Sequence, residues 1–251
     1  TPGVESTTGP LGQGAGNAVG FAIAERFLAA RYNQPGHEIV GHRTFCLVSD
    51  GDLMEGVSSE AASLAGHLKL GKLVCLYDDN HVSLDGPTAQ AFTEDVLRRY
   101  EAYGWQTLRV ENGNTDLDAI DAAIGLAVGQ QDRPTMIAVR TTIGYGSPHK
   151  AGTSSAHGSP LGVEEVALTK KALGWEWTEP FTEPPEAVKN LRTAVERGAK
   201  AQTEWERRFE AWAAGFPDLA AECRDAAKGG LPAGWDAHLP QGQAGASVAT
   251  R

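Results

Sequence analysis

The sequence predicts an α/β fold in which a doubly wound, mostly parallel sheet carries helices on both faces and is followed by a helical C-terminal extension. Short apolar runs typical of buried strands alternate with longer stretches whose apolar residues recur at helical spacing. This alternation indicates a parallel sheet, because the crossover between two parallel strands is usually a helix. We expect the strands at residues 43–48, 73–77, 105–110 and 136–139.

The helices are expected between these strands. The first follows the glycine-rich segment 9–14 and reaches about Arg31, and the second begins near Glu55. A third includes residues 92–103, and a fourth opens on a capping box formed by Thr115 and Asp118. Residues 144–161 are rich in Gly, Ser and Pro and are expected to form a long loop, which in a compact domain is usually functional. The apolar stripe between residues 188 and 212 indicates a long helix that packs through this stripe.

Composition excludes several classes of function. A net charge of −10 argues against a nucleic-acid partner, which requires a basic surface. We expect no membrane association, since no apolar run approaches the roughly 20 residues of a spanning helix. The three cysteines are far apart, and Cys46 and Cys75 lie in apolar runs, so we expect buried thiols and a cytoplasmic location.

Two polar residues at the ends of consecutive predicted strands indicate a metal site. Asp50 follows the first strand and Asn80 follows the second. The carboxyl ends of parallel strands share one edge of the sheet, where α/β proteins bind ligands. One charged and one neutral oxygen ligand suit Mg²⁺ or Ca²⁺, and Gly51 would let a phosphate approach the backbone. The alternative is that Asp-Gly and Asp-Asn form ordinary turns.

These residues also carry a resemblance. The run from Ser49-Asp50-Gly51 to Asn80 is similar to the thiamine diphosphate motif, which is Gly-Asp-Gly followed by Asn, and departs from it only at Ser49, where we expect little loss. The surrounding segments resemble the transketolase family along essentially the whole chain. They are residues 1–5, 8–14, 53–56, 63–71, 77–80 and 156–162.

The resemblance implies a set of cofactor and metal ligands. Asp50, Asn80 and the carbonyl of Val82 correspond to the family's metal ligands, for Mg²⁺ or Ca²⁺. Gly51 and Asn80 correspond to residues that bind the diphosphate.

The rest of the cofactor site is implied by position as well. Gly9 and Leu11 lie where the family meets the aminopyrimidine across a dimer interface, and Leu84 corresponds to a residue that packs beside the thiazolium.

Three further residues are implied to take part in catalysis. His157 corresponds to a histidine that faces the diphosphate and the bound sugar, and Glu55 and Glu60 match acids of a proton-sharing network near the partner's site. Without the family resemblance, a loop histidine such as His157 has a structural role as often as a functional one. The two glutamates would then only stabilise the N-terminal end of a helix, where a negative charge is favourable. The remaining histidines match no family position, and we expect them to be structural or exposed.

The resemblance implies a transketolase, which transfers a two-carbon ketol unit from a ketose phosphate to an aldose phosphate with thiamine diphosphate and a divalent metal. The alternatives are dihydroxyacetone synthase, 1-deoxyxylulose-5-phosphate synthase, or a non-catalytic binding subunit. We expect a diphosphate- and metal-binding domain at 1–162, a helical extension at 163–228 and a linker at 229–251. The sequence opens on the glycine-rich loop with no strand before it, so we expect a chain truncated at both ends, whose partner is a pyrimidine-binding domain in a dimer.

Overall fold

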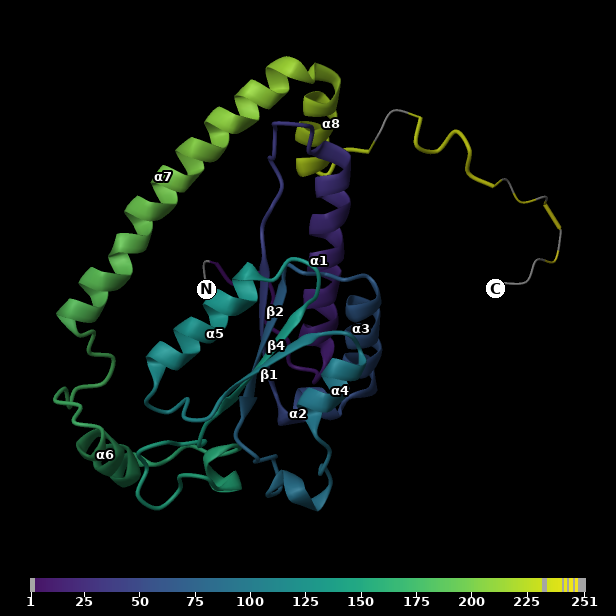
Figure 1. Ribbon diagram of the computed structural model, residues 1–251. Coiled ribbons are helices and arrows are strands. Elements are labelled where there is room, and N and C mark those ends of the chain that lie inside the picture. The colour runs from purple at the N-terminus through teal and green to yellow at the C-terminus, as the bar shows by residue number, and fades with distance from the viewer. Residues whose placement is uncertain (1–2, 232–233, 241, 243, 246, 248–251) are drawn as a thin grey trace. The chain divides into compact units, whose positions relative to one another are not determined.

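The structure is a computed structural model that describes residues 3–231, 234–240, 242, 244–245 and 247 (Figure 1). The chain packs as two compact units. The first comprises Thr1–Arg31 and Val40–Arg192, and the second comprises Tyr32–Ile39 and Thr193–Arg251. Among the described residues, no helix is both long enough and apolar enough to span a membrane.

The first unit is built on a four-stranded sheet with the order β1-β2-β4-β3. Its strands are β1 (Thr44–Ser49), β2 (Leu73–Asp79), β3 (Gln106–Val110) and β4 (Thr135–Arg140). All three strand pairs are parallel, which confirms the predicted sheet. The prediction that β2 ends at residue 77 is wrong, since Asp78 and Asp79 continue the strand and pair with Val139 and Arg140 of β4.

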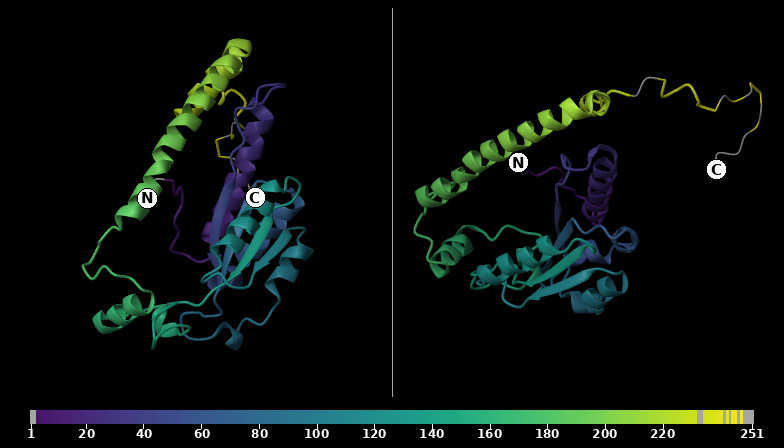
Figure 2. Two further views of the ribbon diagram at one scale, coloured as in Figure 1. Left: turned by 60° about the vertical axis from the view of Figure 1, so that its left-hand side comes forward. Right: turned by 45° about the horizontal axis from the view of Figure 1, so that its top comes forward.

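Helices cover both faces of this sheet, as predicted (Figures 1 and 2). Three helices pack on one face: α1 (Gln13–Tyr32), α3 (Gly56–His67) and α4 (Val96–Ala102). Alanines at 18, 22, 62 and 65 let α1 and α3 approach the strands closely. The opposite face is covered by α5 (Leu117–Gly129), through Ala123 and Ala127. Alternate residues of β2 enter the two cores, Cys75 one and Val74 the other, which explains why its sequence is apolar without interruption.

The helix that was expected to begin near Glu55 is α3, which begins at Gly56 with Glu55 as its N-cap, so this prediction is confirmed. A separate short helix, α2 (Asp50–Met54), precedes it and was not expected; Glu55, with an extended conformation at ψ 138, separates the two. The next two helix starts differ from the prediction. The third helix begins at Val96 with Asp95 as its N-cap, so Phe92 lies before it. The expected capping box of Thr115 and Asp118 is wrong, because Asp116 is the N-cap of α5 and accepts from the backbone N–H of Ala119.

The long loop after β4 leads to α6 (Val163–Ala172) and contains a short 3₁₀ helix, Ser154–Ala156. Another 3₁₀ helix, Thr88–Gln90, lies between β2 and α4. Gly144 and Gly152 have φ of 65 and 70 and lie at turns of the long loop, where a side chain would strain the backbone.

The C-terminal helices are α7 (Pro185–Gly215) and α8 (Pro217–Ala227), which confirms the helical extension. Within the second unit, Trp212 is fully buried and its ring meets the edge of Tyr32 at 6.3 Å between centroids. The indole N–H of Trp205 donates to the carbonyl of Ile39 at 2.9 Å. Part of the predicted stripe therefore packs, although Leu191 and Val195 are exposed.

The expected linker at 229–251 falls partly outside the described residues, which lack positions 232–233, 241, 243, 246 and 248–251. Its described residues form turns without a helix or strand. The domain boundaries therefore stay predictions.

Candidate functional site

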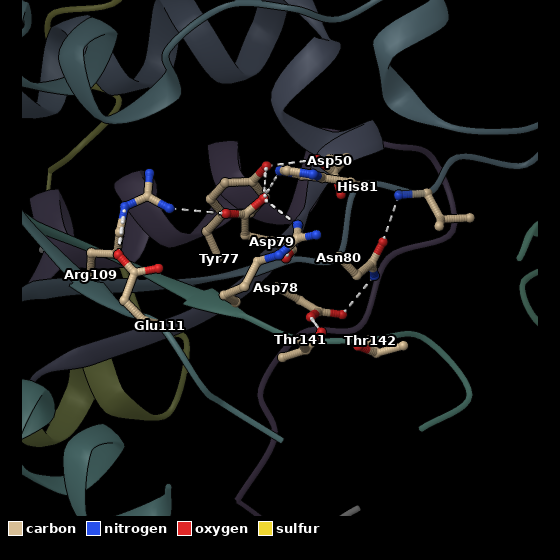
Figure 3. Close-up of polar contacts among 12 residues, drawn as sticks. Asp50, Tyr77, Asp78, Asp79, Asn80, His81, Arg109, Glu111, Thr141 and Thr142 are labelled. Atoms are coloured by element: carbon tan, nitrogen blue, oxygen red, sulfur yellow. Dashed lines mark hydrogen bonds and ion pairs between the residues drawn. The ribbon is translucent and has the colours of Figure 1, made fainter. Parts of the chain in front are cut away.

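The carboxyl ends of β1 and β2 bring the predicted metal ligands to one edge of the sheet (Figure 3). Asp50 is the first residue of α2 and is 1% exposed. Its Oδ1 accepts a hydrogen bond from the hydroxyl of Tyr77 at 2.6 Å, and its carboxylate also faces the backbone N–H of His81. Burial raises the pKa of Asp50, and the hydrogen bond from Tyr77 opposes this rise. Asp50 thus reaches across from β1 to the residues that follow β2.

The second oxygen of Asp50, Oδ2, is buried and has no hydrogen-bond partner. An unpartnered carboxylate oxygen in the protein interior is costly, and a bound cation would satisfy it. Among the described residues, no group of three or more His, Cys, Asp or Glu side chains is placed to hold a metal. The candidate site needs no such group, because its proposed ligands are one carboxylate, one amide and one backbone carbonyl. This donor set suits Mg²⁺, which keeps open positions for phosphate oxygens and water.

Asn80 and Val82 belong to a tight turn beside Asp50. The side-chain oxygen of Asn80 accepts from the backbone N–H of Val82 at 2.9 Å, and its amide group donates to Asp78 at 3.0 Å. His81, between them, has a φ of 60, a left-handed conformation that non-glycine residues seldom adopt. Because the backbone of His81 contacts Asp50, its two neighbours in this turn, Asn80 and Val82, lie next to that contact.

Gly51 lies beneath the glycine-rich loop that precedes α1. A side-chain carbon at Gly51 would lie 3.3 Å from Leu11, so the loop packs directly on this glycine. The backbone N–H of Gly12 donates to Asp52 at 3.0 Å, and the backbone N–H and hydroxyl of Ser49 donate to the same carboxylate at 2.9 and 3.1 Å. Asp52 therefore ties the two segments together. The hydroxyl of Ser49, which a glycine at this position of the motif would lack, contributes one of these bonds.

Leu84 and Gly158, the residue after His157, lie next to each other and form another part of the site. Leu84 lies in a turn closed by hydrogen bonds between Ser83 and Gly86, and it is 63% exposed. A side-chain carbon at Gly158 would lie 3.1 Å from Leu84, so the long loop rests on this leucine. His157 ends the 3₁₀ helix of that loop and is exposed. The structure thus brings the His157 segment to the turn that carries Asn80, Val82 and Leu84.

The remaining predicted residues lie away from this centre. Gly9 is exposed, and no atom lies within 4 Å of a side-chain carbon placed on it. Glu55 is the N-cap of α3 and makes no side-chain capping bond, and Glu60 is exposed on the same helix. None of the described hydrogen bonds or ion pairs joins either glutamate to Asp50 or Asn80. Their implied roles concern a partner and stay predictions.

Sequence reasoning missed the cluster of residues around Asp79. Asp79 is 4% exposed and accepts from Arg109 at 3.3 Å, while the Nε2 of His81 lies 2.9 Å and Arg140 lies 3.6 Å from its Oδ1 (Figure 3). Arg140 also donates to the Asp79 carbonyl at 3.0 Å. The alternation of Tyr77, Asp79 and His81 is the signal that could have placed these side chains on one face.

The long loop of residues 141–162 is held in place by two sets of hydrogen bonds. At its start, the backbone N–H of Thr142 donates to Asn114 at 3.0 Å, and the hydroxyl of Thr141 donates to Asp78. A few residues further on, the hydroxyl of Ser147 and the backbone N–H of His149 donate to Glu165 of α6, the latter at 2.8 Å. The His149 ring lies 2.8 Å from the other Glu165 oxygen. Glu165 thus holds the loop segment that precedes His157.

The hydrogen bonds to Glu165 predict a pH-dependent anchor. They lower the pKa of Glu165 from 4.5 to about 2, with the bond from Ser147 as the largest cause. Since the pKa is lower in the folded protein, the ionised group stabilises the loop above pH 4.5, and this stabilisation is lost as the pH falls toward 2. Glu165→Gln should therefore speed amide hydrogen exchange in residues 147–153 at pH 7, and the ratio to wild type should approach one as the pH approaches 2.

The matched control is Glu164→Gln, which changes the exposed neighbouring residue and should leave this exchange unaltered. An exchange ratio for Glu165→Gln that is the same at every pH would contradict the charged anchor.

Comparison with known proteins gives the family. The family described as transketolase, thiamine diphosphate binding domain, matches residues 1–232. The chain belongs to this family. The transketolase of Geobacillus stearothermophilus is 54% identical over 252 residues, which cover 100% of this chain and 38% of that protein. The chloroplastic transketolase of Solanum tuberosum is 52% identical over 240 residues, which cover 96% of this chain and 32% of that protein.

Solved structures agree with this membership. The transketolase of Leishmania mexicana superimposes with a TM-score of 0.92 at 44% identity, over 97% of this chain and 36% of that one. The predicted thiamine diphosphate-binding fold and its cofactor are thereby confirmed for the family domain. The chain spans 32–38% of the length of these transketolases.

Proposed function

We propose that this chain supplies the diphosphate- and metal-binding half of a transketolase active site. The observation that carries the proposal is the buried, unpartnered Oδ2 of Asp50 beside the turn of Asn80 and Val82. Together these three residues would hold a divalent metal, and the backbone at Gly51 would face the diphosphate. The metal would neutralise the diphosphate and fix its orientation.

The reaction is the transfer of a two-carbon ketol unit between sugar phosphates. Thiamine diphosphate, when bound, supplies the stabilisation of the carbanion. The residues of this chain bind and orient: Leu84 would pack beside the thiazolium, and His157 would hold a proton or hydrogen bond at the sugar. A transketolase from Pichia stipitis with a TM-score of 0.91 has been solved in complex with sedoheptulose 7-phosphate, which supports sugar phosphates as substrates.

The assembly is proposed to be a dimer in which a pyrimidine-binding domain completes the site. Apolar residues around the start of α3 are 38–51% exposed, namely Leu11, Met54, Val57 and Leu64. The loop at Gly12 packs against Glu55 and Val57, and Leu11 of the same loop packs on Gly51, so Leu11 and Val57 lie on neighbouring segments. A surface of this kind favours a protein partner, and Gly9, Glu55 and Glu60 would face it. We place the protein in the cytoplasm on the basis of its free thiols, although plant relatives are named chloroplastic.

Substitution of His157 tests the proposal. In the assembled enzyme, His157→Ala should lower kcat by roughly 10²-fold and change the affinity for thiamine diphosphate much less, because a group that acts on the reacting sugar matters mainly in the transition state. Steady-state kinetics and cofactor titration measure the two effects separately. His67→Ala, which removes an exposed histidine at the end of α3, is the control and should change neither quantity. Unchanged turnover of His157→Ala would return this residue to a structural role.

A further inference from the structure

Among the described residues, no hydrogen bond, ion pair or ring contact involves the side chain of His157, which is exposed. Its backbone N–H donates to the carbonyl of Ser154 at 3.0 Å, where the 3₁₀ helix Ser154–Ala156 ends. The place of the ring therefore depends on the backbone of the loop 141–162, which connects β4 to α6 (Figure 1).

A succession of hydrogen bonds links this backbone to Glu165 of α6. The hydroxyl of Ser147 donates to Glu165, and the same hydroxyl oxygen accepts from the backbone N–H of Lys150 at 3.2 Å. The carbonyl of Lys150 accepts from the backbone N–H and the hydroxyl of Thr153, at 3.2 and 2.7 Å. The carbonyl of Thr153 then accepts from the backbone N–H of Ala156 at 3.1 Å. Each bond fixes the next turn of the loop, and the last one reaches the residue that immediately precedes the histidine.

Lys150 also ties the loop on the other side of His157. Its ammonium group donates to the carbonyl of Pro160 at 3.2 Å. A side-chain carbon at Gly158 would lie 3.1 Å from Leu84, so the segment after the histidine meets the turn that follows β2. His157 therefore lies between a segment anchored to α6 and a segment that rests on the proposed cofactor site.

Glu165 is the fixed point at the start of this succession. It is 8% exposed and Ser147 is 4% exposed, so water has little access to the bond between them. The Glu165 carboxylate also accepts from the backbone N–H of His149 at 2.8 Å, and Nδ1 of the His149 ring lies 2.8 Å from its second oxygen. Hydrogen bonds to an ionised carboxylate are roughly twice as strong as those between neutral groups. One side chain of α6 thus anchors two residues of the loop.

We propose that Glu165 is a positioning residue, which through Ser147 and the loop sets the place of His157 at the bound sugar phosphate. This inference rests on the proposed function, in which His157 acts on the sugar. Glu165 does not touch the substrate in this scheme and acts only through the histidine. A shift of a reacting or catalytic group by about 1 Å can cost about 10²-fold in rate, so a remote anchor can control turnover.

Glu165→Ala in the assembled enzyme tests this role. We expect kcat to fall about 10-fold, because a misplaced catalytic group keeps only part of its effect. The KM for the sugar phosphate donor and the Kd for thiamine diphosphate should each change by less than about 3-fold, since His157 matters mainly in the transition state. The residues proposed to hold the metal and the diphosphate also lie outside this loop. Steady-state kinetics and cofactor titration measure the three quantities.

The deciding measurement repeats the substitution in the His157→Ala background. If Glu165 acts through His157, the double variant should have a kcat within about 2-fold of that of His157→Ala alone, because the effects of coupled residues are not additive. A residue that only supports the fold would lower kcat by the same factor in both backgrounds.

Two further variants complete the test. Glu164→Ala removes the exposed neighbouring carboxylate and should leave kcat unchanged. Ser147→Ala interrupts the succession but keeps the Glu165 carboxylate, and it should lower kcat in the same way by a smaller factor. It keeps the test decisive if Glu165→Ala does not fold.

Two results would overturn the inference. The first is an equal loss of kcat in both backgrounds, and the second is an unchanged kcat in the Glu165→Ala and Ser147→Ala variants. Unchanged turnover of His157→Ala alone would instead refute the role of His157 in the proposed function, so the two failures are distinguishable.

Discussion

Asp50→Asn should abolish metal-dependent binding of thiamine diphosphate in the assembled enzyme, with a loss of more than about 100-fold in metal affinity. Even the loss of a residue that only supports a metal ligand typically costs about 10–100-fold. Asp50 would be the only charged ligand that the chain provides at this site, and its unpartnered Oδ2 is the atom placed to meet the ion. Titration of cofactor binding against Mg²⁺ concentration measures the loss.

The same substitution should leave the metal-free protein as stable as wild type, or more stable. The ionised Asp50 carboxylate is destabilised by burial, which raises its pKa, and an asparagine removes the buried charge while it can still accept from Tyr77. A residue whose removal stabilises the fold but abolishes binding is present for function. Thermal unfolding of the metal-free variant gives the sign.

Asp79→Asn is the matched control, since it changes a second buried aspartate of the same edge. Asp79 is paired with His81, Arg109 and Arg140, and its replacement should destabilise the metal-free protein by about 1–3 kcal/mol. A large loss of stability in Asp50→Asn, equal to that in Asp79→Asn, would indicate that Asp50 is structural. Unchanged metal dependence would refute the site.

The sequence was sufficient to predict the strands and the edge at which the site lies. Apolar runs mark buried strands locally, and the rule that parallel strands end at one edge brings Asp50 and Asn80 together without knowledge of any contact. The same local reasoning placed the end of β2 too early. Asp78 and Asp79 have the composition of a turn, but they continue the strand.

The end of β2 was missed because its cause is distant in the sequence. Asp79 can be buried in a strand because Arg109 and Arg140 pair with it, and these residues are 30 and 61 positions away. The bond from Tyr77 to Asp50 spans 27 positions and was missed for the same reason. Which partner a buried polar group finds depends on the tertiary fold. The ligands of the site could therefore be predicted from a motif, whereas the residues that orient them could not.

The 251-residue chain alone, supplied with thiamine diphosphate, Mg²⁺ and sugar phosphates, should show no ketol transfer. In the proposed function, the chain would offer a diphosphate anchor, a pair of metal ligands and one histidine near the cofactor's predicted position. The family resemblance places the glutamate that meets the pyrimidine on another domain, together with residues that bind the sugar phosphate. Without them, both acid–base and positioning contributions are lost, and acid–base catalysis alone typically contributes about 10²–10⁴-fold.

A pyrimidine-binding domain, supplied covalently or as a second polypeptide, should restore turnover and drive dimer formation. The reason lies in the surface of this chain: Leu11, Met54 and Val57 are apolar and exposed, Glu55 is exposed beside them, and no atom lies within 4 Å of a side-chain carbon placed on Gly9. Coupled detection of glyceraldehyde 3-phosphate, with xylulose 5-phosphate as donor and ribose 5-phosphate as acceptor, measures turnover. Light scattering measures the dimer.

The two parts of this experiment distinguish the proposed function from its rivals. Clear turnover by the chain alone would refute the two-domain account, because that account places the group that acts on the pyrimidine on the other domain. Assembly with the second domain, but without turnover on these sugars, would favour the non-catalytic binding subunit.

In the assembled enzyme, Leu11→Asp would place a charge on the surface that the partner must cover, and it should reduce dimer formation and turnover together. Leu126→Asp on the outer side of α5, where Leu126 is 61% exposed, should reduce neither, so that a general effect of added charge is separated from loss of the interface.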